Sequence, residues 1–197
     1  MEPFVTPSYI DRDESGIEAR TGTGICTGTG LDGVPVVVRA RRATLDDVPA
    51  LVRLRGLMLD GMGVETGGPD APWRAASAQW FTERLRRPGL FAAFLVDDPV
   101  LGVVASAVGT CDAHAPGPAN PSGLQGHVSN VSTDPRRRRL GHARVCLDAL
   151  LTWFREEAGV TVINLNATED GAALYESYGF AAPRHPALQL RTAGASR

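Results

Sequence analysis

The sequence predicts one mixed β-sheet with helices packed on its faces, a fold of the α/β (α+β) class. Short apolar runs bounded by Gly, Pro or Asp predict strands, and apolar residues spaced by three or four positions predict helices. An early hairpin, followed by helices that alternate with strands, predicts both antiparallel and parallel pairs. With 197 residues, of which 43% are hydrophobic and 21% charged, the chain can bury a real core as one domain.

The N-terminal stretch differs from the rest, because it is rich in Gly and Thr and shows no apolar period. We expect residues 1–33 to form a flexible leader and residues 34–197 to form the folded domain. The β-branched run at 36–38 predicts the first strand. Apolar residues at helical spacing predict a first helix from 48 to about 58 and a second over about 75–86.

The second half of the chain alternates strands with helices. Two apolar runs, 90–96 and 100–108, flank an Asp-Asp-Pro turn and predict a hairpin. The loop 109–126 is long and contains three prolines, which is typical of functional or mobile loops. The remaining expected elements are strands at 127–133, 160–165 and 187–191 and helices at about 140–157 and 170–177.

Charge and composition exclude several classes of protein. Lys and Arg number 20 against 22 Asp and Glu, so any anion-binding site must be local, and we expect no general affinity for nucleic acid. No apolar run is long enough to span a membrane, and the N-terminus lacks the features of a secretory signal. The three cysteines are scattered and show no metal-ligand spacing, so we expect no metal and a reducing, cytoplasmic location.

One stretch combines the end of a strand, a run of four arginines (136–139) and the start of a helix. Gly141 has no Cβ and Ala143 is small, so a ligand can approach the backbone there. The free N–H groups and the dipole of a helix N-terminus favour phosphate oxygens, and arginine adds charge-assisted bonds. We therefore predict a phosphate site here; the alternatives are a solvated basic run or a nucleic-acid patch.

This stretch and a second one downstream resemble two motifs of the GNAT superfamily of N-acetyltransferases. Arg138, Gly141 and Ala143 fit the end of the pattern V-x-x-x-x-R-x-x-R/Q-x-x-G-x-G/A, and the run LYESYGF at 174–180 fits L-Y-x-x-x-G-F. One helix and one strand separate the two motifs, as in the family. The resemblance covers about residues 36–191 and implies a mixed, mostly antiparallel sheet of six to seven strands, with strands 4 and 5 splayed and about four helices around it.

The resemblance also implies acetyl-CoA as the donor, held between the splayed strands. The pantetheine arm would pair with the backbone at Val131 and Thr133, and the pyrophosphate would bind the N–H groups of 138–143. Thr168 stands where the family often has an Asn; it could instead cap the last helix, and Asn164 or Asn166 could replace it. The expected cofactor-binding residues are Val131, Ser132, Thr133, Arg138, Arg139, Leu140, Gly141, His142, Ala143 and Thr168.

Two catalytic residues follow from the same resemblance. Tyr175 matches the family's usual general acid, which protonates the leaving thiolate; the alternative is a tyrosine packed in the core. His127 lies where histone-modifying relatives carry a glutamate base, and imidazole can relay a proton near neutral pH. The alternatives are a surface histidine on a strand and a water molecule as the base.

These inferences predict an enzyme that transfers an acetyl group from acetyl-CoA to a primary amine of a small molecule, by direct attack in a ternary complex. Alternatives are acetylation of protein N-termini or lysines, a non-catalytic acyl-CoA sensor, and a nucleic-acid binder that uses the arginine run. A strongly acidic acceptor cleft would favour a polycationic antibiotic over an amino-acid-like amine. In the family the region around Trp73 and Trp80 lines the acceptor pocket, although both could equally be core residues. We expect no membrane partner and leave a homodimer open.

Overall fold

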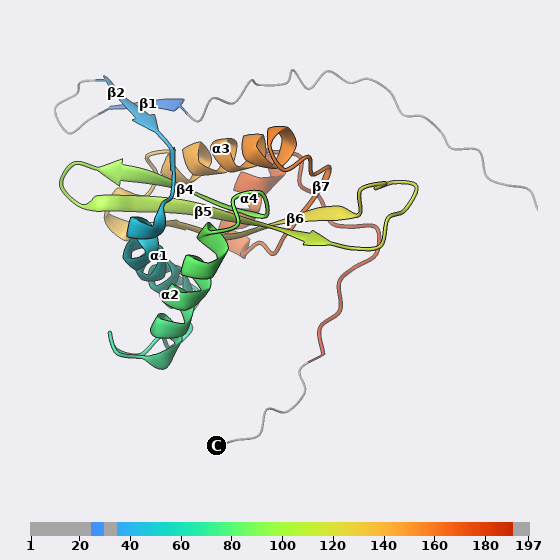
Figure 1. Cartoon of the computed structure of the whole chain (residues 1–197). Helices are drawn as coiled ribbons and strands as arrows, with labels where there is room; N and C mark the ends of the chain where they lie inside the picture. The colour runs from blue at the N-terminus through green and yellow to red at the C-terminus, as the bar shows by residue number, and fades with distance from the viewer. Residues whose placement is uncertain (1–24, 30–34, 191–197) are drawn as a thin grey trace, which may run out of the picture.

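The computed structural model of the chain describes residues 25–29 and 35–190. Its main sheet has five strands in the order β3-β4-β5-β6-β7, with β6 and β7 parallel and all other neighbours antiparallel. A separate antiparallel pair precedes it (Figure 1). The strands are β1 (Ile25–Thr29), β2 (Pro35–Arg39), β3 (Arg41–Arg42), β4 (Phe91–Asp98), β5 (Gly102–Ala113), β6 (Leu124–Thr133) and β7 (Val162–Leu165).

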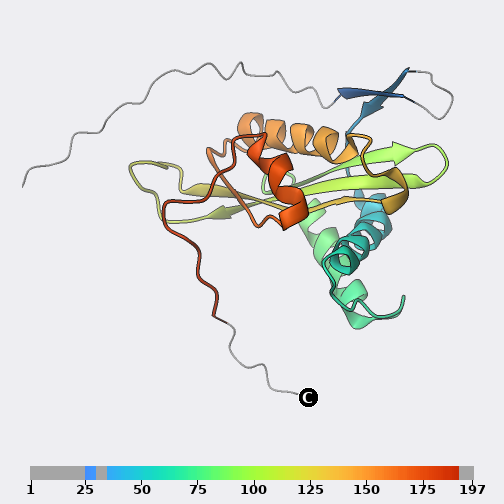
Figure 2. The same ribbon diagram turned by 180° about the vertical axis from the view of Figure 1, so that it is seen from behind.

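Helices cover both faces of the main sheet. A 3-10 turn, η1 (Leu45–Asp47), leads into α1 (Val48–Gly61), and α1 and α2 (Pro72–Leu85) lie on one face. The opposite face carries α3 (His142–Glu156), while α4 (Glu169–Glu176) follows β7 (Figures 1 and 2). Among the described residues, no helix has both the length and the apolar character needed to cross a membrane.

The α3 face is packed closely because two strand glycines leave room for an aromatic ring. A Cβ placed at Gly109 or at Gly126 would lie 2.7 Å from atoms of Phe154. Trp153 and Phe154 are 1% and 0% exposed and fill the centre of this cluster. Because side chains alternate along a strand, the position after Gly126 on β6 must face away from α3.

A second apolar cluster fills the space between the sheet and the pair α1–α2. Leu51 of α1, Phe81 of α2 and Phe91 of β4 are each no more than 2% exposed. The rings of Phe81 and Phe91 meet edge to face. The two clusters enclose the sheet, which holds β6 rigidly between two helical layers.

The predicted fold class is confirmed, but the strand count is lower than expected. The strand expected at 36–38 corresponds to β2, which pairs with β1 and lies outside the main sheet. No strand forms over residues 187–190, where Leu188 and Leu190 are 95% and 87% exposed and therefore gain no burial from an extended conformation. The main sheet consequently has five strands rather than six or seven.

The strand β1 lies inside the segment expected to be a leader. Its backbone pairs with β2, and its own sequence shows no apolar period that would predict a strand. Residues 1–24 and 30–34 lie outside the described part of the chain. The flexible leader and the boundary at residue 34 stay predictions.

Candidate functional site

The site is built around the point where β6 and β7 stop pairing. Four residues of β6, 125–128, pair with β7, and the last pair joins Val128 to Leu165. Beyond that pair β7 ends, whereas β6 continues to Thr133. The β7-facing edge of β6 is therefore unpaired over 129–133, which is the divergence expected of the two splayed strands.

A β-bulge lies within this unpaired stretch. Ser106 of β5 pairs with Ser132, but Val108 pairs with Ser129, so β6 carries one extra residue between these pairs. Asn130 takes up the irregularity with a φ of 47°, in the left-handed region that Asn tolerates better than most residues. The bulge turns the backbone of β6 just where it loses its neighbour.

Three consecutive residues of α1, on the sheet face that does not carry α3, bind this part of β6 and the residue that follows it. Arg55 Nη1 donates to Asn130 Oδ1 over 2.6 Å, and Ser132 Oγ donates to the carbonyl of Leu54 over 3.0 Å. Arg53 pairs with Asp134 at 3.2 Å and also donates to a β5 carbonyl. Helix α1 thus holds the part of β6 that has no β7 partner.

The predicted anion cradle follows β6 directly. Pro135–Arg137 forms the 3-10 turn η2, and the chain then passes through two left-handed residues, Arg139 with φ 63° and Gly141 with φ 78°. Helix α3 begins at His142. The first N–H of this helix that donates to a backbone carbonyl is that of Val145, which bonds Gly141 O over 3.1 Å. The earlier N–H groups at this helix end are therefore free to bind an anion.

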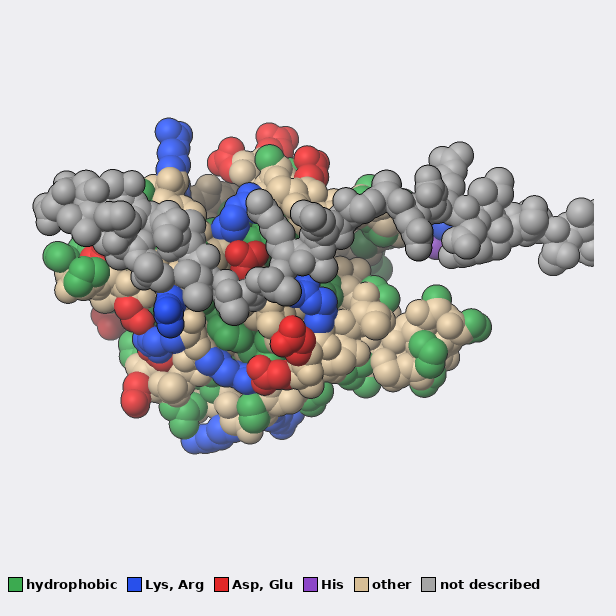
Figure 3. All heavy atoms as spheres, turned by 90° about the horizontal axis from the view of Figure 1, so that it is seen from above, with side chains coloured by type: hydrophobic (Ala, Val, Ile, Leu, Met, Phe, Trp, Pro, Cys, Tyr) green, Lys and Arg blue, Asp and Glu red, His purple; other side chains and the backbone are tan. Residues whose placement is uncertain are grey.

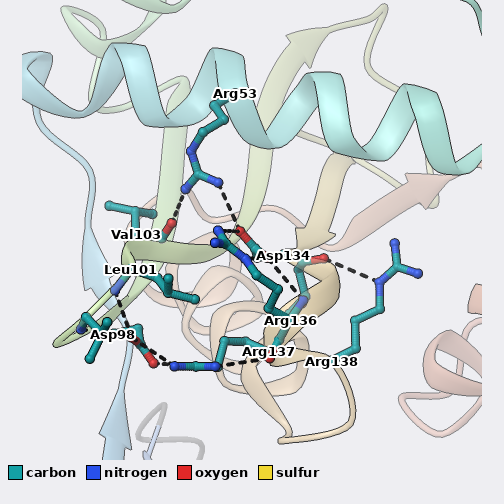
Figure 4. Close-up of polar contacts among 10 residues, drawn as sticks. Arg53, Asp98, Leu101, Val103, Asp134, Arg136, Arg137 and Arg138 are labelled. Atoms are coloured by element: carbon teal, nitrogen blue, oxygen red, sulfur yellow. Dashed lines mark hydrogen bonds and ion pairs between the residues drawn. The ribbon is translucent and has the colours of Figure 1, made fainter.

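Only part of the arginine run is available to a ligand (Figure 4). Arg136 donates twice to the Asp134 carboxylate, at 2.9 Å each, and Arg137 Nε donates to Asp98 over 2.6 Å. Arg138 makes one long contact of 3.5 Å with a β6 carbonyl, and Arg139 has no partner among the described residues. The structure thus assigns two arginines to holding the loop and leaves two with free guanidinium donors.

His142 plays a different part from its neighbours in the loop. Its side chain is 8% exposed and its Nδ1 has no partner in the described part of the chain. Burial lowers the pKa of this imidazole, with Asp98 opposing and Arg137 adding to the effect. His142 is therefore held neutral beneath the loop, and its backbone N–H rather than its ring is what it offers a ligand.

The carboxylates that anchor the loop predict acid-sensitive stability. Hydrogen bonds from Arg137 lower the pKa of Asp98 to about 2, and Arg136 holds the pKa of Asp134 well below its usual range. Each carboxylate stabilises the fold above its unfolded pKa of about 3.9, and that contribution is lost as the pH falls through the folded value. We expect the free energy of unfolding in urea to fall between about pH 4 and pH 2.

Asp98→Asn should remove part of this acid response and lower stability at pH 7 by about 1–3 kcal/mol. Asp112→Asn is the matched control, because Asp112 lies on β5 and is exposed. An Asp98→Asn variant with the wild-type pH dependence would contradict the role of the Asp98–Arg137 pair.

A pocket of 410 Å³ lies on the α1–α2 face beside the bulge. It is lined by Arg55, Trp73, Ala76, Ser77, Trp80, Phe81, Ser129 and Asn130. Both tryptophans therefore stand in the wall of one pocket with β6. His127 is half-buried, and the alternation along β6 places it on the same face as Ser129, opposite the α3 face of Gly126.

Two tyrosines of the second motif differ sharply in their hydrogen bonding. Tyr178 donates to Asp148 Oδ1 over 2.5 Å and lies 3.3 Å from the carbonyl of Arg144, so it ties the end of α4 to α3. Tyr175 packs edge to face on Phe180, and its hydroxyl makes no hydrogen bond to a described residue. Desolvation raises the pKa of Tyr175, so the phenol stays protonated throughout the neutral range.

Three other predicted residues have side chains that the structure does not leave free for the cofactor or does not place in the predicted role. Thr168 occupies the N-cap position of α4, but its side chain makes no capping bond. Asn164 donates to Gln125 Oε1 over 3.2 Å and is thus engaged across β6 and β7. The Ser132 side chain is buried against α1, which leaves only its backbone for a ligand.

Sequence reasoning missed Arg53, Arg55, Asp98 and Asn130. Asn is disfavoured inside strands, so its place within 127–133 was the available signal for a bulge. Two arginines within the apolar run of α1 were the signal for buried partners.

Comparisons with known proteins show the family to which the chain belongs. A model of the acetyltransferase (GNAT) family matches residues 64–180. A predicted acetyltransferase with acetyl-CoA from Clostridium acetobutylicum is 25% identical, with 78% of this chain and 96% of that chain covered and a TM-score of 0.69.

Two further structures support the fold alone. A GCN5-related N-acetyltransferase from Ralstonia eutropha JMP134 has a TM-score of 0.62 at 23% identity, covering 78% of this chain and 98% of that one. Glucosamine-6-phosphate N-acetyltransferase from Arabidopsis thaliana has a TM-score of 0.58 at 15% identity, covering 79% and 97%. The curated proteins contain no significant match. The family match spans more than half of the chain, so this chain belongs to the GNAT family of acetyltransferases.

Proposed function

We propose that this enzyme acetylates the amine of a small molecule by direct transfer from acetyl-CoA in a ternary complex. Acetyl transfer from acetyl-CoA is the reaction that the family match indicates. The observation that supports a small acceptor is the pocket of 410 Å³, whose walls come from α1, α2 and the β6 bulge. A volume of this size suits a metabolite-sized ligand.

The chain's own residues fit the donor. The unpaired edge of β6 over 129–133 offers backbone groups to an extended amide-bearing arm. The free N–H groups at the start of α3, with Arg138 and Arg139, suit a diphosphate. When bound, acetyl-CoA supplies the acetyl group as a thioester, and coenzyme A leaves as the free thiol.

The reaction moves protons at two atoms, the amine nitrogen and the thioester sulfur. The amine must be neutral to attack, so His127 or a water molecule takes its proton. The nitrogen lone pair then forms the new C–N bond, the C–S bond breaks, and the nitrogen releases its second proton to the same base or to solvent. Tyr175, held protonated by burial, gives its proton to the departing sulfur, and solvent restores it. Orientation of the two substrates supplies much of the remaining rate.

Thiol release from acetyl-CoA with a panel of small amines tests the proposal. We expect turnover with at least one small amine, slower turnover with peptides that offer only an N-terminus or a lysine, and a lower kcat in a His127→Gln variant if imidazole is the base. Tight CoA binding without turnover of any amine would favour an acyl-CoA sensor. Preference for a peptide would favour protein acetylation.

The structure also bears on the alternative of a DNA-binding protein that uses the arginine run. Ion pairs occupy Arg136 and Arg137, and blue and red side chains are interspersed on the α3 side (Figure 3). We therefore expect weak, salt-dependent DNA binding that CoA displaces.

A further inference from the structure

The charges around the acceptor pocket restrict what it can bind. Arg55 is the one charged side chain among the described residues that line the pocket, and none of those residues is acidic. Two more arginines lie just behind the walls. The guanidinium carbon of Arg74 is 4.5 Å from the ring centre of Trp73, and that of Arg84 is 5.4 Å from the ring of Trp80. This surrounding positive charge opposes a polycationic acceptor.

The Arg55 guanidinium is held in place at one nitrogen and has unpaired N–H donors on the other two. Its Nη1 donates to Asn130 Oδ1, which holds the guanidinium beside the bulge of β6. Its Nε and Nη2 make no hydrogen bond within the described part of the chain. A planar guanidinium with two free donors suits a carboxylate, which it can bind through paired N–H···O bonds.

Two tryptophans whose rings are held by neighbouring groups form the apolar part of the pocket wall. Trp73 is fixed by its Nε1–H, which donates to the carbonyl of Thr66 over 2.6 Å. Trp80 packs edge to face on Phe81 at 5.2 Å and on Phe91 at 5.6 Å between ring centres. Such walls favour a flat or branched apolar group, which gains from burial against fixed rings.

We propose that the acceptor is an α-amino acid with a free carboxylate and an apolar side chain. Arg55 binds the carboxylate, the two tryptophans hold the side chain, and the α-amine is thereby placed next to the bulge of β6. This inference rests on the proposed small-amine acetylation. It names a substrate class that a protein N-terminus cannot imitate, because a peptide has an amide where the free amino acid has its carboxylate.

The test compares pairs of acceptors that differ only in the carboxylate. L-Phenylalanine and L-leucine are each compared with their amides, and 2-phenylethylamine and spermidine complete the panel. We expect kcat/KM for the acids to exceed that for the amides by at least about tenfold, since a charge-assisted bond contributes about 1.5–3 kcal/mol. Spermidine should be the poorest acceptor.

Two substitutions at Arg55 separate charge from structure. Arg55→Gln can still donate to Asn130 but has no charge, so the ratio of acid to amide should collapse towards one. Arg55→Lys retains the charge but not the paired bonds, so it should keep a ratio between those of the wild type and Arg55→Gln. Dividing the wild-type ratio by that of each variant cancels the different basicities of the acid and amide amines. CoA binding, measured by calorimetry, reports whether each variant keeps the part of β6 that Arg55 holds through Asn130.

An acid-to-amide ratio that Arg55→Gln leaves unchanged would overturn the inference. If no amine is turned over, the proposed acetylation fails, and calorimetry of L-phenylalanine against L-phenylalaninamide on the CoA complex still decides this inference. Heat of binding for the acid alone, lost in Arg55→Gln, would support it; equal binding or no binding of either would reject it.

Discussion

Replacing Gly141 by Val is expected to weaken CoA binding by about 100-fold. Gly141 has a φ of 78° and is the N-cap of α3. A β-branched residue is strained there by roughly 1–3 kcal/mol, so the loop would rotate out of the left-handed region. That rotation misdirects the free N–H groups that follow it and adds bulk over them. Losing two bonds to a charged phosphate accounts for a change of this size.

Gly159→Val is the matched control for this prediction. Gly159 also has a positive φ, 65°, but it follows the far end of α3, and a Cβ there would meet no atom within 4 Å. Calorimetry should show the control binding CoA as the wild type does, at a similar cost in thermal stability. Wild-type affinity for CoA in the Gly141 variant would contradict the prediction that the start of α3 binds the diphosphate.

Replacing Tyr175 by Phe is expected to lower kcat by about 100- to 1,000-fold, with little change in KM for either substrate. The ring that packs on Phe180 is preserved, so the fold should not suffer. What is lost is a proton donor, and general acid catalysis contributes typically 10²–10⁴. Because its burial keeps the phenol protonated, the rate of the wild type should show no acidic-group titration from Tyr175 near neutral pH.

Tyr178→Phe provides the comparison on the same helix. Its hydroxyl is engaged with Asp148 and the chain at Arg144, so its removal should lower the free energy of unfolding by about 1 kcal/mol and leave kcat nearly unchanged. Equal losses of kcat in the two variants would mean that the hydroxyls act through structure. An unimpaired Tyr175→Phe enzyme would mean that water protonates the sulfur.

The elements with strong local patterns were predictable from the sequence. The buried face of α3 follows its apolar spacing, and a turn does separate β4 from β5, although it begins at Pro99 because both aspartates belong to β4. The start of α3 is two residues later than expected, since the left-handed Gly141 delays it. The strand β1 escaped prediction because its stability derives from pairing with β2 and not from a pattern of its own.

Contacts between distant residues were the part that local patterns could not supply. Arg55 and Asn130 are 75 positions apart, and Arg53 and Asp134 are 81 apart. The four arginines look alike in the sequence, yet Asp98, 39 positions before Arg137, decides which of them is removed from ligand binding. The positions of the motif residues were thus foreseeable, but the division of labour among them was not.

The separate attachments of α1 and α2 have a consequence for how this enzyme could change over evolution. Helix α1 is bonded to β6 at the bulge and beyond it, so substitutions along it disturb the donor and acceptor sides together. Helix α2 contributes most of the wall of the proposed acceptor pocket, from Trp73 to Phe81, and Phe81 is its one fully buried residue. New acceptors can therefore be acquired by mutating the outer turns of α2, and descendants of this enzyme should diverge there while retaining the same acetyl donor.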